Sequence, residues 1–524
     1  MDDAPETLDA LAAHAHDTSV VVIGGGIGGL VAALECAKIG LRVTVVEASD
    51  RLGGALWTAK VGGLAVDLGA EGYATRGGAV RRLVDELGLT DAVTAPDARA
   101  EWIAGLPDGS APLPAGTVRG IPENPWDESV RRLIGWRGTW RAYLDRLRPP
   151  LTIGQERSLG RLVRTRMGDA VLDRLVAPLS LGAFSIHPDD VDVEAVAPGL
   201  SSALTRTGSL AGGVAQLRAD CREEGEGAEG FEGIDGGMSR LIDALRSRLA
   251  ELGARVVLNA RVSEIEPRAD GRWSVVLDAG SPAGFAVESG AVQRDPLDAG
   301  GSGAGAETAG SDDPAAVPLE PADALIIATG AAETVRLVRA AVPSLEPLPV
   351  TELEVVTLVV SSRELTARPA RTAVYPVPGN AVAASVTDTT ARWPWVRRAS
   401  GEDEHVLKVT FGGPDAPPAT LSLDDAAAAE LAVAAASALL EVPLDPARVR
   451  GSSRARYEQP LPVSAIGHRE VVDAVRSAIH AVPGLAVVGA AVAGTGIAQV
   501  VPDARAEAER VRRRALWPSA EPGE

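Results

Sequence analysis

The sequence is poor in cysteine and lysine and has no excess of basic residues. Its two cysteines, Cys36 and Cys221, are too few for a disulfide framework or a cysteine-rich metal site, and they fit a reducing compartment. Lysine occurs only at Lys38, Lys60 and Lys408, so arginine supplies nearly all the positive charge. The net charge of −20 disfavours nucleic acid and a generally anionic membrane, because the long-range field repels both. We expect a cytoplasmic protein without a metal.

Targeting and membrane-spanning signals are also absent from the pattern. The N-terminal stretch MDDAPETLDALAAHAHD is acidic and lacks the basic and apolar regions of a signal peptide. Ser477 to Pro502 carries no charge unless His480 is protonated, and it is long enough to span a bilayer. However, Pro483 and four glycines interrupt it, so it predicts a turn, a buried strand, a glycine turn and a helix.

A glycine-rich turn lies near the N-terminus. Val20–Ile23 is typical of a buried parallel strand, a GxGxxG pattern follows at 24–29, and a second strand, Arg42–Val46, leads to Glu47. The glycines allow a tight turn, approach of a pyrophosphate and close helix packing, and the helix N-terminus attracts the phosphate. The Glu47 carboxylate can accept both ribose hydroxyls and disfavours a 2′-phosphate. The pattern predicts a dinucleotide other than NADP.

The nucleotide-binding parts are scattered along the chain. Further buried strands are expected within Ala322–Gly330 and at Leu485–Val488, far from the first turn. Between them lie an arginine-rich amphipathic region, a stretch with few large apolar residues and a strand-rich region. The predicted divisions are dinucleotide-binding parts at 18–90, 230–335 and 479–517, a helical insertion at 91–229, a flexible loop at 280–318 and a substrate domain at 336–478.

Several segments resemble one family. ASDRLGGALWTAKVGGLAVDLGAEGYATR, which follows Glu47, resembles the FAD-binding start of the flavin amine oxidase superfamily, and within it the porphyrinogen oxidases. Four later segments are similar to porphyrinogen oxidases in the same order: SLGRLVRTRMGDAVLDRLVAPLSLGAFSIHPDDVDV, FEGIDGGMSRLIDALRSRL, LPVSAIGHREVVDAVRSAI and GLAVVGAAVAGTGIAQVVPDARAEAERV. The resemblance covers residues 19–511. It implies an α/β, two-dinucleotide-binding-domain FAD fold, Rossmann-like and discontinuous, with a mixed-sheet substrate domain and a helical insertion.

The resemblance also implies which residues bind FAD. Gly24–Gly29 and Glu47 would hold the phosphates and ribose, with Arg51, Gly54 and Ala55 beside them. Gly69–Gly72 would line the flavin, and the backbone of Val262 would meet the adenine. Thr495–Ile497 would approach the isoalloxazine from a helix N-terminus, whose dipole stabilises negative charge on the reduced ring. The expected cofactor-binding residues are Gly24, Gly25, Gly26, Ile27, Gly28, Gly29, Glu47, Ala48, Arg51, Gly54, Ala55, Gly69, Ala70, Glu71, Gly72, Val262, Ala490, Thr495, Gly496 and Ile497.

No catalytic side chain is implied, because the flavin carries the chemistry. His468 is the tempting base, but a structural or pocket-edge role fits it better. Four positions depart from the family pattern: Ala55, Gly330, Val500 and Pro502. They mark either a divergent branch or weakened flavin contacts, and we favour the first.

The implied activity is oxidation of coproporphyrinogen III to coproporphyrin III in haem biosynthesis, with O2 as acceptor and H2O2 as product. The substrate's four propionates call for arginine partners. The candidates are Arg131, Arg132, Arg137, Arg141 and Arg146, although a solvated amphipathic helix face explains these arginines as well. The resemblance also suggests that the helical insertion contacts a membrane periphery or a partner such as the iron-inserting chelatase.

Rival functions remain open. Protoporphyrinogen IX is the alternative substrate within the family. A flavin amine oxidase usually places aromatic rings before the flavin, whereas Leu485–Val501 has none and the nearest tyrosine is Tyr457. A desaturase lacks the match at Gly467 and His468. A non-enzymatic flavin-binding relic would explain the four departures.

Overall fold

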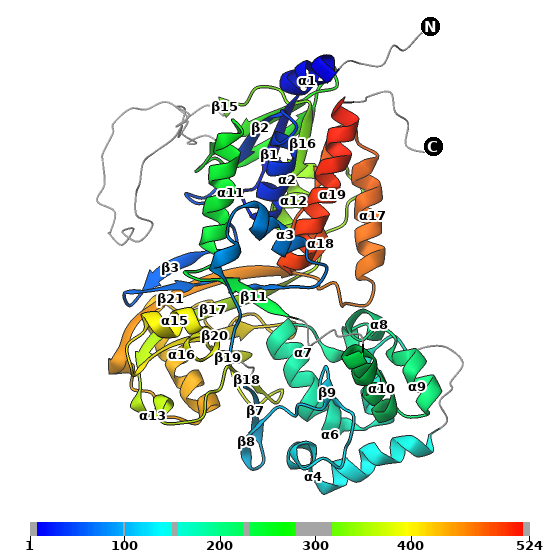
Figure 1. The fold of residues 1–524 in the computed structure, drawn as a ribbon, viewed down its shortest axis with the longest axis vertical. Coiled ribbons are helices and arrows are strands. Elements are labelled where there is room, and N and C mark those ends of the chain that lie inside the picture. The colour runs from blue at the N-terminus through cyan, green and yellow to red at the C-terminus, as the bar shows by residue number, and fades with distance from the viewer. Residues whose placement is uncertain (1–7, 98–99, 149–155, 224–229, 279–316, 517–524) are drawn as a thin grey trace.

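The computed structural model describes residues 8–97, 100–148, 156–223, 230–278 and 317–516. The loop predicted at 280–318 lies almost entirely outside the described residues. Figure 1 shows a nucleotide-binding body at one end of the molecule, with a strand-rich body and a helical body side by side at the other.

A five-stranded parallel sheet forms the centre of the nucleotide-binding body. Its strands come from the beginning, middle and end of the chain, as the scattered motifs predict, and its order is β12-β2-β1-β16-β22. The bounds are Arg255–Val257 for β12, Arg42–Val46 for β2, Ser19–Ile23 for β1, Ala324–Ile327 for β16 and Leu485–Val487 for β22.

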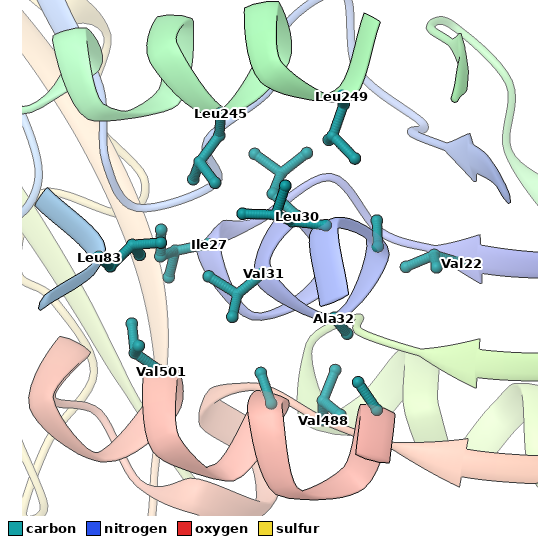
Figure 2. Close-up of a cluster of buried hydrophobic side chains, with 14 of the residues drawn as sticks. Val22, Ile27, Leu30, Val31, Ala32, Leu83, Leu245, Leu249, Val488 and Val501 are labelled. Atoms are coloured by element: carbon teal, nitrogen blue, oxygen red, sulfur yellow. The ribbon is translucent and has the colours of Figure 1, made fainter. Parts of the chain in front are cut away.

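Both faces of this sheet are covered, which is why β1 is apolar at consecutive positions. Val20 and Val22 pack in one core, while Val21 and Ile23 pack in another. The first core lies among α2 (Ile27–Ala37), α11 (Ser239–Glu251) and α19 (Ile497–Leu516). Figure 2 shows Leu30 of α2 facing Leu245 and Leu249, with Val501 of α19 on the opposite side.

The second core lies between the sheet and smaller elements. These are β13 (Val262–Pro267), β14 (Trp273–Leu277), α12 (Ala331–Val338) and α17 (His468–His480). The short strand β15 (Val317–Pro318) pairs with β14. Among the described residues, no helix has both the length and the apolar character needed to cross a membrane. The stretch from Ser477 to Pro502 instead forms the end of α17, β22, α18 (Ala490–Ala493) and the start of α19, as predicted.

A seven-stranded sheet of order β21-β17-β20-β19-β18-β7-β8 builds the strand-rich body. Its strands are β21 (Val449–Pro460), β17 (Val350–Ser361), β20 (Glu404–Gly412), β19 (Ser385–Asp388), β18 (Ala373–Pro376), β7 (Glu101–Leu106) and β8 (Gly109–Pro112). The alanine-rich helix α16 (Asp425–Leu440) packs on this sheet, and its apolar side chains share a core with Phe411.

The prediction of a helical insertion over 91–229 is wrong for its first part. β7 and β8 belong to the seven-stranded sheet, because β7 pairs in parallel with β18, more than 260 residues later in the chain (Glu101 opposite Ala373). Ile103 and Ala104 point to opposite faces of that sheet and both are buried. The helices follow: α4 (Glu128–Tyr143), α5 (Leu159–Arg166), α7 (Ala177–Phe184), α9 (Leu200–Thr207) and α10 (Leu210–Glu223).

Candidate flavin site and adjoining cavity

The glycine turn connects β1 to α2 with very close packing. Gly24 has a φ of 110°, and a Cβ there would collide with the carbonyl of Ala328. A Cβ on Gly29 would collide with the carbonyl of Gly24, which explains why the last glycine of the motif is required. A Cβ on Gly26, in contrast, would meet nothing within 4 Å.

The N-terminus of α2 is therefore an open cradle. No side chain caps this helix at Gly26, so its first N–H groups, beginning at Ile27, lack a side-chain acceptor. Such a helix end attracts an anionic group through its N–H donors and its dipole. The open space and the uncapped donors fit the diphosphate of a dinucleotide.

Glu47 lies beside this cradle at the end of β2. One carboxylate oxygen accepts from Gly25 N at 2.7 Å, and the other accepts from the backbone and side chain of Ser49 at 2.8 Å each. Ala48 lies between these residues in the chain. The oxygen that faces Ser49 already accepts two bonds, whereas the oxygen that faces Gly25 accepts one. That second oxygen therefore retains capacity for a ribose hydroxyl.

The second glycine pair reaches the same place. Gly53 donates its N–H to Gly25 O at 2.8 Å, and a Cβ on Gly54 would lie 3.4 Å from the Cα of Gly26. Arg51 donates to Gly54 O at 3.1 Å and stacks on Trp57, 4.3 Å from the ring centre. Burial lowers the pKa of Arg51. Residues 51–54 thus close one side of the cradle, as the motif predicts.

The C-terminal motif closes the other side. A Cβ on Gly28 would approach the Cα of Gly489 to 2.9 Å, so the turn before Ala490 packs directly on α2. Val500 fills the same contact. Thr495 and Gly496 precede α19, which continues through Pro502 in spite of the missing N–H. Two of the departures, Val500 and Pro502, therefore fit within an intact helix.

Gly69–Gly72 lies across from the start of α19. Ala70 N donates to Ala55 O at 2.9 Å, and a Cβ on Gly69 would come within 3.1 Å of the hydroxyl of Tyr457 on β21. Ala55, another departure, thus contacts this segment through its backbone. Ala70 and Gly72 border two hollows of the structure, one on each side of the segment.

Val262, the residue expected at the adenine, lies at the start of β13. It begins β13 near Glu47, since Ala260 N donates to Glu47 O at 2.9 Å. Its side chain is buried, and its carbonyl already accepts from Arg336 at 2.6 Å. The adenine contact through the backbone of Val262 stays a prediction. Gly330 caps α12, and a Cβ there would have only Glu458 within 4 Å.

A buried ion pair lies behind Gly69–Gly72. Lys408 of β20 is 2.7 Å from the carboxylate of Glu71 and also donates to Gly69 O at 3.2 Å. Thr389 and Trp393 donate to the same carboxylate at 2.9 Å each. Burial would raise the pKa of Glu71, but the charges of Lys408 and Arg392 and these hydrogen bonds outweigh it and lower the pKa to about 2. Glu71 is therefore a buried anion that joins Gly69–Gly72 to the strand-rich body.

The two hollows differ in character. The smaller, with an empty volume of about 930 Å³, lies between Gly69–Gly72 and the seven-stranded sheet, where Lys408 and Tyr457 line it. The larger, about 1400 Å³, extends from Thr495–Ile497 into the helical body. Among the residues that the structure describes, its lining is mostly apolar and contains Arg76 and Arg119 but no aspartate or glutamate. We call this larger hollow the helical-body cavity.

The candidate arginines lie away from both hollows, and the sequence did not indicate other residues that line them. None of the five arginines predicted for propionates lines either hollow. Arg141 instead donates to three backbone carbonyls at the end of α5, and Arg132 pairs with Glu128 at the surface. Tyr457, set aside because it is far from the closing motif in sequence, lies at Gly69. His468 begins α17 and lines neither hollow.

Comparison with known proteins identifies relatives over the whole chain. The family model described as flavin containing amine oxidoreductase matches residues 27–512. A coproporphyrinogen III oxidase from Propionibacterium freudenreichii subsp. freudenreichii is 27% identical over 545 aligned positions, which span 96% of this chain and 92% of that protein. One from Mycobacterium bovis is 33% identical over 273 positions, or 50% of this chain and 59% of that protein.

Solved structures share the fold. A crystal structure from Exiguobacterium sp. 255-15, described as a candidate protoporphyrinogen oxidase, superposes with a TM-score of 0.76 at 23% identity, covering 95% of this chain and 99% of that one. A reduced UDP-galactopyranose mutase superposes with a TM-score of 0.61 at 13% identity, covering 96% and 95%. These likenesses confirm the predicted fold class.

Proposed function

Because the chain belongs to the family of flavin-containing amine oxidoreductases, we propose that it oxidises coproporphyrinogen III to coproporphyrin III, with O2 as electron acceptor and H2O2 as second product. The cofactor is FAD, since the family carries a flavin and the chain has a dinucleotide-binding turn. Loss of six hydrogens from the macrocycle reduces three O2 to three H2O2. Relatives named coproporphyrinogen III oxidase support the substrate class.

The helical-body cavity is the observation that carries this proposal. In the described part of its lining, apolar walls combine with two arginines and no acidic residue, in a chain whose net charge is −20. That combination suits a large apolar ring with carboxylate side chains. The cavity also borders Ala70, Gly72 and Thr495–Ile497, where the predicted flavin contacts meet.

The chain's own residues have the following proposed roles. The α2 N-terminus holds the diphosphate, Glu47 holds the ribose, and the α19 N-terminus stabilises negative charge at the ring. Bound there, FAD supplies the two-electron acceptor. The cavity walls orient the macrocycle and exclude water, and no acid or base among the lining residues is required for these roles.

An oxygen-uptake assay on the purified, FAD-loaded protein tests the proposal. Coproporphyrinogen III and protoporphyrinogen IX are offered separately while porphyrin fluorescence is followed. Faster turnover of the first supports the proposal, and preference for the second moves the activity to protoporphyrinogen. Turnover of neither would contradict both. Amines belong in the same assay, because Tyr457 and Phe231 place aromatic rings at Gly69–Gly72.

We also propose peripheral contact with a membrane through α4 and the turn after it. Trp136 and Trp140 are 61% and 55% exposed and Leu147 is 78% exposed, and Trp126 packs edge-on against both tryptophans. Arg131 lies over the Trp136 ring at 4.6 Å. Exposed tryptophan with flanking arginine is typical of a membrane interface.

Vesicle flotation tests this contact. Protein should float with vesicles that contain phosphatidylglycerol, and replacement of Trp136 and Trp140 by serine should abolish flotation. Protein that stays at the bottom with every vesicle would contradict the membrane contact and favour a protein partner, such as the iron-inserting chelatase.

A further inference from the structure

Arg119 occupies a position in the helical-body cavity that backbone geometry alone would not give to arginine. It is the first residue of a two-residue hairpin turn between β9 (Thr117–Val118) and β10 (Ile121–Pro122). Arg119 has a φ of 52° and Gly120 has a φ of 84°. Two positive φ values define the type I′ turn, which strongly favours asparagine or glycine at its first position. Arginine is strained there.

The surrounding contacts hold the guanidinium in place. The Nε of Arg119 donates to Val196 O at 3.3 Å, and its guanidinium lies 5.1 Å from the ring centre of Phe184 at the end of α7. Val196 and Phe184 also line the helical-body cavity, so the arginine is fixed within its wall. Gly120 cannot shift, because a Cβ there would already press on the backbone of Leu175 and Val176.

Arg119 lies at the end of the helical-body cavity that is away from the expected flavin ring. Thr495–Ile497 and Gly72 mark the end where the flavin ring is expected, whereas Arg119, Phe184 and Val196 belong to the helical body. A ring system oriented with its reacting edge at the first end would direct peripheral substituents toward the second. The only other charged residue in the lining described is Arg76, which is exposed.

From these observations we propose that Arg119 is the residue that selects carboxylate-bearing substrates, by binding a carboxylate of the macrocycle at the helical-body end of the cavity. The inference rests on the proposed function, since it names the group recognised in the same site. Binding and steering by Arg119 involve no covalent step. Arg76 lies at the rim, where a charge acts on the association rate and its salt dependence.

Three variants separate recognition from structure. Arg119→Asn supplies a residue that the type I′ turn prefers, so it should fold without loss of thermal stability while it removes the charge. Arg119→Lys retains the charge without the planar fork. Arg248→Gln, on the exposed face of α11 and remote from the cavity lining, is the matched control.

The main measurement is a fluorescence titration of the FAD-loaded protein with coproporphyrin III and, separately, with its tetramethyl ester. Arg119→Asn should weaken binding of the acid by about 10- to 100-fold, as expected for loss of a charge-assisted hydrogen bond. Binding of the ester should change by less than about twofold. In turnover, KM for coproporphyrinogen III should rise while kcat stays within about twofold of wild type, because the oxidation occurs at the other end of the cavity.

Each outcome is decisive. Equal weakening of acid and ester would assign Arg119 a structural role, and unchanged binding of the acid would place the carboxylate elsewhere; both overturn the inference while the proposed function stands. A wild-type protein that holds FAD but binds and oxidises no porphyrinogen would instead overturn the proposed function. Should Arg119→Asn fail to fold, Arg119→Lys carries the same comparison, with a smaller loss expected.

Discussion

Breaking the Glu71–Lys408 ion pair should be among the most destabilising conservative changes in the chain. Glu71→Gln keeps the size and one acceptor oxygen but leaves the ammonium of Lys408, which is 7% exposed, without its counter-charge. The pKa of Glu71 is about 2 instead of 4.5, and at 1.36 kcal/mol per pKa unit this corresponds to about 3 kcal/mol. Loss of one partner of a buried pair typically costs about 3–5 kcal/mol, which agrees.

A double-mutant cycle measures this interaction. Glu71→Gln, Lys408→Met and the double variant are unfolded in urea at pH 7, with tryptophan fluorescence as the probe. The two single changes should sum to at least about 2 kcal/mol more than the double change, because the double variant leaves no unpaired charge. A coupling below about 0.5 kcal/mol would refute the reasoning. Glu251→Gln, which removes the exposed partner of Arg248, is the control and should cost at most about 0.5 kcal/mol.

The stability that the Glu71 carboxylate contributes should depend on pH. Because the folded-state pKa of Glu71 is below its unfolded value, its contribution to stability is complete above about pH 4.5 and is lost as the pH falls toward 2. The stability difference between wild type and Glu71→Gln should therefore shrink over that range. A difference that stays constant down to pH 3 would show that the charge of Glu71 is not its source.

Three further predictions concern neighbouring residues. Gly26→Ala should leave the apoprotein stable but weaken FAD binding by at least about tenfold, since its methyl group enters the open cradle; Gly28→Ala should lower thermal stability as well, because it meets the backbone of Gly489. Burial raises the pKa of Asp67 to about 6, so the stability of the folded protein should fall as the pH rises from about 4 to 6. In urea titrations, Asp67→Asn should therefore raise the free energy of unfolding by up to about 3 kcal/mol at pH 7.5 and by much less at pH 4.5. Tyr457→Phe should change turnover without changing FAD affinity, measured by flavin fluorescence; an altered FAD affinity would place the hydroxyl on the cofactor.

The nucleotide-binding half of the site could be predicted because its signals are local. The strand, turn and helix at 19–37 follow from a buried apolar run and glycines at fixed offsets, and Glu47 ends the next strand. These residues touch one another within about thirty positions of sequence, as the bond from Gly25 N to Glu47 shows. Short-range geometry of this kind is determined by residue type and spacing.

The substrate half could not be predicted in the same way. Lys408 reaches Gly69 O across 339 positions, and Arg119 meets Phe184 only through packing of the helical body. β7 was missed because a short strand without alternating burial carries a weak pattern, and its partner β18 lies far along the chain. For the arginines on α4 the sequence leaves a substrate contact and a solvated face both open, because composition identifies charge but not the face that carries it.

The Glu71–Lys408 pair connects the predicted flavin segment to the strand-rich body. Glu71 belongs by sequence to the predicted flavin segment, yet its partners Lys408, Thr389 and Trp393 all come from the strand-rich body. The segment that is expected to line the flavin is therefore positioned by the wall of the smaller hollow and by Ala55 N-terminal to it. A change in the ion pair should consequently alter both FAD affinity and kcat, whereas Gly26→Ala alters FAD affinity and Arg119→Asn alters substrate affinity. Separate responses of this kind would locate the coupling between cofactor and substrate in the Glu71–Lys408 pair, because no other buried ion pair among the described residues joins Gly69–Gly72 to the seven-stranded sheet.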